Sequence, residues 1–451
     1  MKILIKGAGD LATGIASRLY GAGHRILMTE IPVPLTVRRT VALSRAVYEG
    51  RARVEEMEGI LAEDREAAEK IMEQGDIAVM VDPNASCRSW FVPDVIVDGI
   101  LAKKNLGTEI TDAPFVVGVG PGFTAGQDCN CVVETKRGHT LGNIIWQGSA
   151  IPNTGVPGNV GGYTIERLIR AGSDGRIEPK VQIGDYVEKG QTVAVTGGVP
   201  VYARMSGIVR GMLQEGAEVT ENLKIGDIDA RAEISHCYTV SDKARAIGGG
   251  VLEAVSSFEK MKDAFAVIVL AAGKGTRFGG DKLNAIVRNR PMYEHMLDKV
   301  QAFGAFPAFV VTGSRRIAED AAKRGITPVE NREPERGISH SLILGLKAAL
   351  RHRPELRGVL FSVCDQPGIG IPTMQRIFNM ALHHPSCIIC AGNGKKTGNP
   401  VFWDRVYFSE LMELTGDEGG RQVIRKHGDR LRVVQTDPEE LKDIDRREDL
   451  W

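Results

Sequence analysis

Short apolar segments that end in Gly or Asp alternate with helical stretches near the start of this sequence. Five segments have this strand-like character: residues 3–5, 24–30, 76–82, 94–100 and 115–120. The alternation predicts a parallel sheet covered by helices, because one parallel strand can follow another only through a crossover connection. We therefore expect an α/β fold, with a first domain over residues 1–161.

The same alternation returns in the last part of the sequence. The apolar strand candidates there are residues 264–271, 306–313, 358–367 and 386–392. The segments between them carry apolar residues at helical spacing. A second α/β domain is expected over residues 263–451.

Residues 162–232 have a different sequence pattern. Short β-like runs are broken by turn-forming groups such as SDG, EKG and TGG, and the stretches VQIGDYVEKGQTVAV and GMLQEGAEVTENLKIGDI share a weak repeat. This pattern predicts a small all-β barrel or sandwich made of two similar halves. Residues 233–262 are expected to form a helical return or linker.

The composition argues against several classes of protein. The 451 residues include 57 basic and 57 acidic ones, so the net charge is zero, which argues against nucleic acid as the main partner. Seven scattered cysteines imply no disulfide framework. No apolar run approaches the roughly 20 residues of a membrane helix. We expect a cytoplasmic protein that binds neither nucleic acid nor membrane.

The stretch AVIVLAAGKGTRFGGDKL, residues 266–283, carries the strongest functional signal. Its loop contains four glycines: Gly273, Gly275, Gly279 and Gly280. Glycines let backbone N–H groups approach a polyphosphate, and Arg277 and Lys282 add positive charge. The spacing is not that of a Walker A loop. The alternative is a plain corner between a strand and a helix.

Carboxylates follow in the same part of the sequence. Asp365 ends an apolar strand in VCDQP, and the carboxyl end of a strand faces the usual ligand crevice of an open α/β sheet. Mg²⁺ takes one or two carboxylates together with phosphate oxygens. Asp443 and Asp445, in DIDRREDL, are candidates to complete such a site. The alternative is that these residues cap a turn or a helix.

A second glycine-rich turn, GAGDLA, occupies residues 7–12. It follows a strand, opens a helix and matches a dinucleotide-binding fingerprint through Gly7, Gly9 and Ala12. Glu30 closes the next strand, where a ribose-binding acid would lie. We therefore interpret the first domain as Rossmann-like and expect NAD or another nucleotide there. The alternative is a Rossmann-like domain that binds no dinucleotide, because no hydride-transfer residues follow.

The cysteines carry weaker signals. Cys129 and Cys131 flank one residue, and His139 lies eight positions on, which is poor spacing for zinc. A Cys129 thiolate could hold sulfur or selenium, but buried, unreactive cysteines are the simpler interpretation. Cys387 and Cys390 would point to opposite faces of a strand, which favours core packing.

The last domain resembles the MocA/MobA-like nucleotidyltransferases that act on molybdenum cofactor. LAAGKGTRFGGDKL resembles the signature loop of that family, and five further blocks follow in the same order: GISHSL, CDQP, GNPVFW, GDEGGRQVI and DIDRREDL. The resemblance implies a nucleotidyltransferase α/β fold of the GT-A/Rossmann-like type.

The resemblance also implies roles for individual residues. Arg277 and Lys282 would bind the triphosphate, and Asp365 and Asp445 would bind Mg²⁺. The segment that would wrap the nucleotide comprises Leu270, Ala271, Ala272, Gly273 and Gly275. The residues that would line the nucleotide or substrate pocket are Gly337, Ser339 and Ser341.

Some positions refine or depart from the family pattern. Ala272 gives the LAAG form of the loop, which in the family goes with CTP rather than GTP. His340 stands where the family has Ser. Arg446 and Arg447 stand where it has Thr-Pro, which puts the geometry of the Asp445 ligand in question.

The implied reaction is in-line attack of the molybdopterin phosphate on the α-phosphorus of CTP, with release of pyrophosphate. The protein would align the reactants and neutralise charge through Mg²⁺, Lys282 and Arg277. Two alternatives stay open: transfer to another phosphorylated small molecule, and an inactive fold that serves as a cofactor chaperone.

Residues 1–256 resemble the YqeB-like accessory proteins of selenium-dependent molybdenum hydroxylases. The blocks GAGDLATG, TDAPFVVGVGPGFTAGQDC and IGGGVLEAV carry this resemblance. It implies a maturation factor whose partner is a molybdenum hydroxylase apoenzyme. The middle segment resembles biotinyl/lipoyl-type barrel-sandwich domains, but its hairpin tip, TGGVPV, has no modifiable Lys. We expect a structural or docking module there.

Overall fold

The chain is described by a computed structural model, which covers all residues except 154–159, 274–277, 304–305, 395 and 450–451. It divides into two units, Met1–Val255 and Ser256–Trp451. The division falls inside helix α5 (Asp242–Ala264), close to the end of the predicted linker. The predicted first domain and the predicted all-β segment, residues 162–232, therefore belong to one unit.

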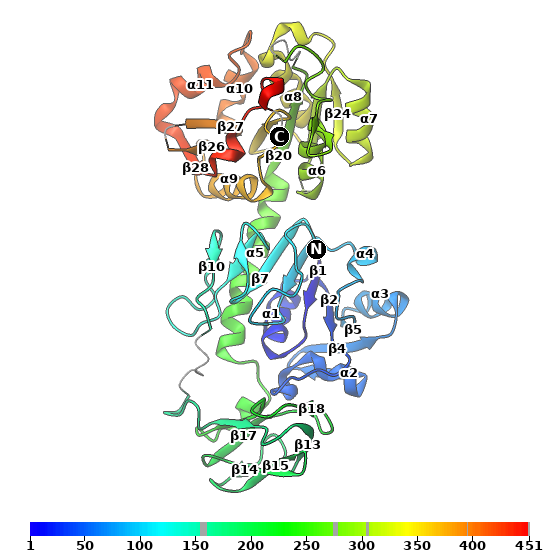
Figure 1. The fold of residues 1–451 in the computed structure, drawn as a ribbon, viewed down its shortest axis with the longest axis vertical. Helices are drawn as coiled ribbons and strands as arrows, with labels where there is room; N and C mark the ends of the chain where they lie inside the picture. The colour runs from blue at the N-terminus through cyan, green and yellow to red at the C-terminus, as the bar shows by residue number, and fades with distance from the viewer. Residues whose placement is uncertain (154–159, 274–277, 304–305, 395, 450–451) are drawn as a thin grey trace. The chain divides into compact units, whose positions relative to one another are not determined.

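The N-terminal unit is built on a nine-stranded sheet with the order β10-β9-β7-β6-β1-β2-β5-β4-β3 (Figure 1). All neighbours from β9 to β4 pair in parallel, and the edge strands β10 and β3 are antiparallel. The strands are β1 (Lys2–Lys6), β2 (Arg25–Glu30), β3 (Arg51–Val54), β4 (Met57–Ala62), β5 (Ile77–Val81), β6 (Val95–Asp98), β7 (Phe115–Val119), β9 (Cys131–Val133) and β10 (Ile144–Ile145). A strand forms in each of the five predicted segments.

Helix α1 connects β1 to β2 and is packed closely on α5. The helices of this unit are α1 (Asp10–Gly21), α2 (Ala46–Glu49), α3 (Arg65–Glu73), α4 (Arg88–Phe91) and the first part of α5. A Cβ atom added to Gly14 of α1 would lie 2.5 Å from the Cβ of Ala244 in α5. The absence of a side chain at Gly14 therefore permits this contact between the helices.

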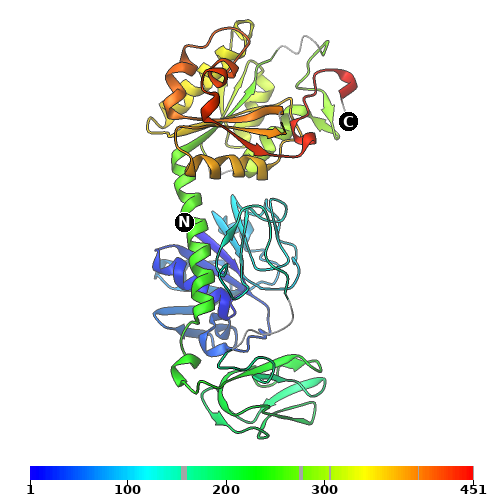
Figure 2. The ribbon, with the colours of Figure 1, turned by 90° about the vertical axis from the view of Figure 1, so that its left-hand side faces the viewer.

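The predicted all-β segment folds as two four-stranded antiparallel sheets, drawn in green in Figures 1 and 2. Their orders are β12-β19-β17-β14 and β16-β15-β13-β18. The strands are β12 (Leu168–Arg170), β13 (Gly175–Pro179), β14 (Tyr186–Val187), β15 (Thr192–Thr196), β16 (Val199–Tyr202), β17 (Gly207–Met212), β18 (Glu218–Val219) and β19 (Lys224–Asp229). We call residues 168–229 the β module.

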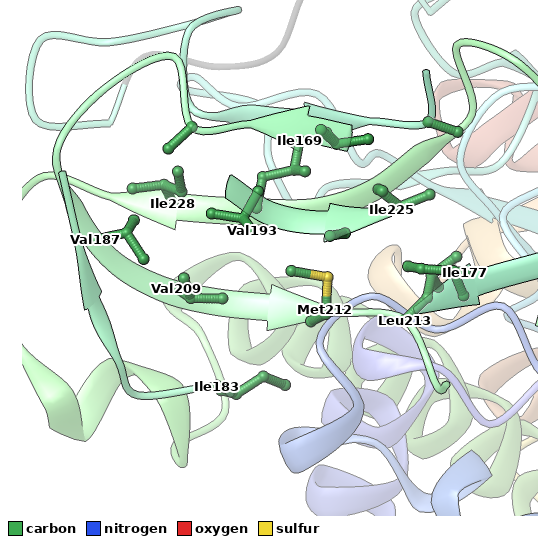
Figure 3. Packing of buried hydrophobic residues seen from close by; sticks show 14 of the residues in the cluster. Ile169, Ile177, Ile183, Val187, Val193, Val209, Met212, Leu213, Ile225 and Ile228 are labelled. Carbon is green, nitrogen blue, oxygen red and sulfur yellow. The ribbon is translucent and has the colours of Figure 1, made fainter. Parts of the chain in front are cut away.

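The β module has its own hydrophobic core. Figure 3 shows side chains such as Ile177, Val193 and Met212 pointing into one cluster, and all three are fully buried. Val37 from the preceding domain packs against the same cluster, and its carbonyl accepts a 2.8 Å hydrogen bond from the Met212 N–H. The module is therefore anchored to the loop that follows β2.

The C-terminal unit contains a seven-stranded sheet with the order β24-β23-β20-β25-β27-β26-β28. The strands are β20 (Phe265–Ala271), β23 (Ala308–Thr312), β24 (Thr327–Glu330), β25 (Gly358–Val363), β26 (Ile388–Asn393), β27 (Lys396–Asp404) and β28 (Leu431–Gln435). Strand β27 is antiparallel to both of its neighbours, so the sheet is mixed. Strand β27 was not expected from the sequence, because its first half, KTGNP, is rich in residues that disfavour strands.

Helices of the C-terminal unit connect its strands, as the apolar spacing predicted. They are α6 (Met292–Ala302), α7 (Arg315–Lys323), α8 (Ile338–His352), α9 (Ile371–His383), α10 (Phe408–Met412) and α11 (Arg421–Lys426), together with the last part of α5. Rings of Phe265, Phe378 and Phe402 contact one another with centroids 4.8–5.9 Å apart. These contacts join β20, α9 and β27 into one core.

Among the helices that the structure describes, none combines the length and the apolar character of a membrane-spanning segment.

Candidate functional site

Three predicted residues meet at the carboxyl end of strand β25. Asp365 follows the strand, and Asp445 comes from the C-terminal segment. The Lys282 ammonium donates a 2.9 Å hydrogen bond to Asp365 Oδ2 and another of 2.9 Å to Asp445 Oδ1. Residues that are 83 and 163 positions from Lys282 in the sequence thus converge on a single cation.

The charges of this cluster are coupled. Burial lowers the pKa of Lys282, but the Asp365 and Asp445 carboxylates outweigh burial and raise it overall. Asp443 lies nearby and accepts a 2.8 Å hydrogen bond from Gln366 Nε2. Burial raises the pKa of Asp443, and the neighbouring carboxylates add to this rise. The ammonium therefore stays charged at neutral pH and neutralises part of an acidic cluster.

The donor set fits a hard divalent cation only in part. Asp365 and Asp445 already direct oxygens at one positive charge, and their side chains are 33% and 48% exposed, so a ligand can reach them. Within the described residues, no group of three His, Cys, Asp or Glu side chains is arranged to hold a metal ion. Two carboxylates are sufficient for Mg²⁺ when phosphate and water oxygens complete its shell.

The backbone around Asp445 is well ordered by hydrogen bonds. The Asp449 carboxylate accepts from the N–H groups of Asp445 (2.9 Å) and Arg446 (2.7 Å). The Ile444 N–H donates to the Asp365 carbonyl at 3.0 Å. Asp445 therefore reaches the site although Arg446 and Arg447 replace the Thr-Pro of the resembling family.

The signature loop is described in part. Leu270 and Ala271 end strand β20, and Ala272 and Gly273 follow it. Gly275 and Arg277, predicted to bind the nucleotide and its triphosphate, lie outside the described residues.

The start of helix α8 supplies the predicted pocket residues. Gly337 has a φ of +85°, and a Cβ there would lie 2.6 Å from the Gly416 carbonyl oxygen. Ser339 is buried, and its hydroxyl has no hydrogen-bond partner among the described residues. Ser341 accepts a 3.0 Å hydrogen bond from Asn331 Nδ2. Ser339 is therefore the one of these two serines whose side chain has no hydrogen bond within the described residues.

Sequence reasoning missed Lys299, which belongs to the same region. Its ammonium, on helix α6, donates to the Pro367 carbonyl in the CDQP segment. Burial lowers the pKa of Lys299 to about 8. We assign Lys299 a positioning role, because it holds the backbone just after Asp365. No motif marks this lysine, which lies in a helix with an ordinary amphipathic pattern.

The N-terminal unit contains a cavity of about 1150 Å³ beside the GAGDLA turn. Of the residues predicted to bind a ligand there, Gly7, Gly9, Ala12 and Glu30 line this cavity. Cys129 does not line it. The Cys129 side chain is fully buried, and burial raises its pKa to about 12, which favours the unreactive interpretation of this thiol.

Glu30 holds the turn. Its Oε1 accepts from the Ala8 N–H at 3.0 Å, and its Oε2 accepts from the Ile31 N–H at 2.8 Å. Burial raises the pKa of Glu30, against the lowering effect of these two hydrogen bonds. Both carboxylate oxygens thus already bind backbone groups of the protein.

Comparison with known proteins finds a similarity for each half of the chain. Residues 267–431 carry a MobA-like NTP transferase domain. The N-terminal half is similar to the uncharacterized protein YqeB of Escherichia coli K12, with 49% identity over 253 residues, which are 56% of this chain and 47% of YqeB. The chain thus spans about half the length of that relative. The predicted combination of a YqeB-like half and a MobA-like domain is confirmed.

Two more distant similarities were found. The bifunctional protein GlmU of Rhizorhabdus wittichii is 35% identical over 120 residues, or 26% of this chain and 25% of GlmU. The crystal structure of Rv0371c from Mycobacterium tuberculosis superposes with a TM-score of 0.37 and 26% identity, covering 41% of this chain and 94% of that one. The MobA-like domain supports nucleotide transfer as the chemistry of the C-terminal unit.

Proposed function

We propose that the C-terminal unit transfers CMP from CTP to the phosphate of molybdopterin cofactor and releases pyrophosphate. The observation that carries this proposal is the convergence of Asp365 and Asp445 on Lys282 at the end of β25, within a MobA-like NTP transferase domain. The choice of CTP rests on Ala272 in the LAAG form of the loop.

Each residue has a defined task in this reaction. Asp365 and Asp445 would hold Mg²⁺, which when bound supplies charge neutralisation for the phosphates. The oxygens of an incoming triphosphate compete with the two carboxylates for the Lys282 ammonium. The Ser339 hydroxyl, which has no partner among the described residues, is the group that we assign to hydrogen-bond the nucleotide or the pterin. The protein thus aligns the two phosphates and stabilises charge, without covalent chemistry of its own.

We further propose that the product serves a molybdenum hydroxylase apoenzyme, with the YqeB-like half assisting its maturation. The resemblance of that half to accessory proteins of this pathway supports the role. A second candidate is an inactive cofactor chaperone. It is favoured by one observation: Lys282 already neutralises both candidate metal ligands.

Pyrophosphate release separates the two candidates. The assay contains Mg²⁺, intact molybdopterin cofactor and one of CTP, GTP, ATP or UTP. We expect cofactor-dependent release with CTP, and a loss of about 100-fold or more in Asp365→Asn, in line with the removal of a group that stabilises transition-state charge. Asp429→Asn, which changes an exposed aspartate far along the sequence, is the matched control and should retain activity.

Silence with all four nucleotides, in a folded sample that still binds the cofactor, would contradict nucleotidyl transfer and support the chaperone. Release with GTP in place of CTP would keep the transferase and correct its nucleotide.

A further inference from the structure

The cavity of the N-terminal unit is strongly cationic. Ten Lys or Arg side chains line it, against three lining carboxylates, those of Asp10, Glu30 and Asp227. Carboxylates outside the lining pair with three of these cations: Asp98 with Lys6, Asp242 with Arg137 and Asp229 with Arg210. The sequence as a whole has no net charge, so the excess is local. A cavity of about 1150 Å³ is at the upper end of the usual range for small-molecule sites and has room for a dinucleotide-sized ligand.

The β module supplies one wall of this cavity. Arg167, Arg170, Arg210 and Lys224 come from its strands or the residue next to them, and all four line the cavity. The GAGDLA turn and the start of α1 contribute to the same lining. The GAGDLA turn and the β module therefore form the cavity together. Residues 7–12, which match a dinucleotide-binding fingerprint, make up only part of its lining.

Several of these cations are fixed in place by the protein. Asp227, which is fully buried, accepts from Arg210 Nε at 3.0 Å and also pairs with Arg167. The Nε groups of Arg167 and Arg38 are buried without a hydrogen-bond partner among the described residues. The Arg38 side chain is 9% exposed and that of Arg167 is 11% exposed, so an unmet donor there is costly unless a ligand accepts from it.

Other lining cations form no salt bridge with a described carboxylate. Lys103, Lys136 and Lys243 line the cavity, and their side chains make no hydrogen bond or salt bridge with any described residue. Burial lowers the pKa of Lys243, and the neighbouring Arg137 lowers it further. Arg170 uses one NH group on the Asn222 carbonyl, at 2.7 Å, and contacts no described carboxylate. Positive charge accumulated in this way favours an anionic ligand.

The start of helix α1 adds a further anion-binding element. Its N-cap residue, Gly9, provides no side-chain hydrogen bond to the first turn, so backbone N–H groups there are available. The one acidic residue of that turn, Asp10, lies 3.7 Å from Arg38 Nη1, which offsets its charge.

We infer that the GAGDLA turn and the β module together bind a small molecule with at least two linked phosphate groups. The helix start receives one phosphate, and the cations of the β module face the other or the remainder of the ligand. Four of the lining cations, Lys103, Lys136, Arg170 and Lys243, form no salt bridge with a described carboxylate, which is more positive charge than a single phosphate would match. The β module is thus a ligand-binding element rather than only a structural or docking module. This inference does not rest on the activity of the C-terminal unit.

The test uses the full chain, with inorganic pyrophosphate, orthophosphate, CDP, CTP and NAD⁺ as separate probes. Hydrogen–deuterium exchange identifies the protected peptides, and calorimetry gives the dissociation constants. We expect pyrophosphate and CDP to protect residues 7–12 together with β12 and β19. The double variant Arg170→Gln/Lys224→Gln should weaken this binding about tenfold or more, because charge-assisted phosphate contacts are lost.

The matched control is Arg204→Gln/Lys189→Gln, which removes the same charges from the same module at exposed positions that do not line the cavity. Equal weakening in this control, or no protection of residues 7–12 with any probe, would overturn the inference. Orthophosphate binding as tightly as pyrophosphate would overturn the requirement for linked phosphates.

The nucleotide arms identify the source of the diphosphate. Tighter binding of CDP or CTP than of NAD⁺ assigns a mononucleotide, and the reverse assigns a dinucleotide; either result supports the site. Protection around Lys282 is a separate readout that reports on the proposed transferase site. Its presence or absence does not change the result at residues 7–12.

Discussion

The Lys282 ammonium is held in one position by two carboxylates. Its replacement is expected to lower catalytic activity while the chain still folds. Lys282→Met removes both 2.9 Å hydrogen bonds and the positive charge that the proposed reaction would set against the phosphates. We expect kcat/KM for nucleotidyl transfer to fall about 100-fold, because phosphoryl chemistry depends on fixed positive charge.

The control is Lys442→Met, an exposed lysine in the same C-terminal segment. It should leave kcat/KM unchanged. An unchanged kcat/KM in Lys282→Met, with pyrophosphate release intact, would show that the ammonium only stabilises the two aspartates.

At the residue scale, the sequence predicts those parts of the site that are marked by motifs. Lys282, Asp365 and Asp445 occur in recognisable blocks, and the structure brings them together. Lys299 and Asn331 occur in no such block, so their contacts with Pro367 and Ser341 depend on the folded chain. Glu30, predicted to bind a ribose, lines the cavity, and both of its oxygens also accept hydrogen bonds from backbone N–H groups, which no sequence motif indicates.

At the element scale, the start of helix α8 depends on Gly337. Its φ of +85° is unfavourable for any residue with a side chain, and a Cβ would meet the Gly416 carbonyl at 2.6 Å. Gly337→Ala should lower the free energy of unfolding by about 1–3 kcal/mol, as expected for backbone strain. It should also displace Ser339 and so reduce turnover.

Gly394→Ala is the control for Gly337→Ala. Gly394 also has a positive φ, of +57°, but a Cβ there would meet no atom within 4 Å. Chemical denaturation of both variants gives the comparison. A loss of stability in Gly337→Ala no larger than in Gly394→Ala would show that the Gly416 contact adds nothing to the strain.

The β module contains a carboxylate that makes its stability depend on pH. Burial raises the pKa of Asp229, but Arg231 and Arg210 outweigh burial and lower it from 3.8 to about 2. Because the folded pKa lies below the unfolded one, the stabilisation is complete above about pH 4 and is lost as the pH falls toward 2. A shift of this size corresponds to about 2 kcal/mol.

Urea denaturation between about pH 5 and pH 2, followed by signals from the β module, tests this dependence. The free energy of unfolding of the wild type should fall over that range. Asp229→Asn should remove the part of this pH dependence that comes from Asp229, and it should lower the free energy of unfolding at pH 7. An identical pH dependence in both proteins would contradict the assignment to Asp229.

The elements that the sequence predicts are those with an uninterrupted apolar pattern. The five predicted strands of the nine-stranded sheet and β20 are built around apolar runs, and each appears where it was expected. Strand β27 escaped prediction since its pairing with β25 and β26 stabilises a segment that contains Gly398 and Pro400. Tertiary pairing there outweighs local preference.

At the scale of the whole molecule, the sequence pattern divides the chain by the type of secondary structure, whereas the structure divides it into compact units. Composition marked residues 162–232 as a distinct all-β part, yet this part belongs to the same unit as the first sheet. The reason lies in particular contacts, such as the Val37 side chain in the core of the module and the Arg39 Nε bond of 3.2 Å to the Met212 carbonyl. Contacts of this kind leave no periodic signal in the sequence.

All seven cysteines are buried and unpaired, and they are distributed over both units. For six of them, including Cys131 and Cys364, burial raises the thiol pKa, so the nucleophilic thiolate is scarce in the native state. A thiol reagent can therefore modify the protein only as fast as its cores open. The rate of cysteine modification therefore reports the rate of local unfolding in each half of the chain. Burial of the thiols, with no disulfide, limits their access to oxidants in the folded protein.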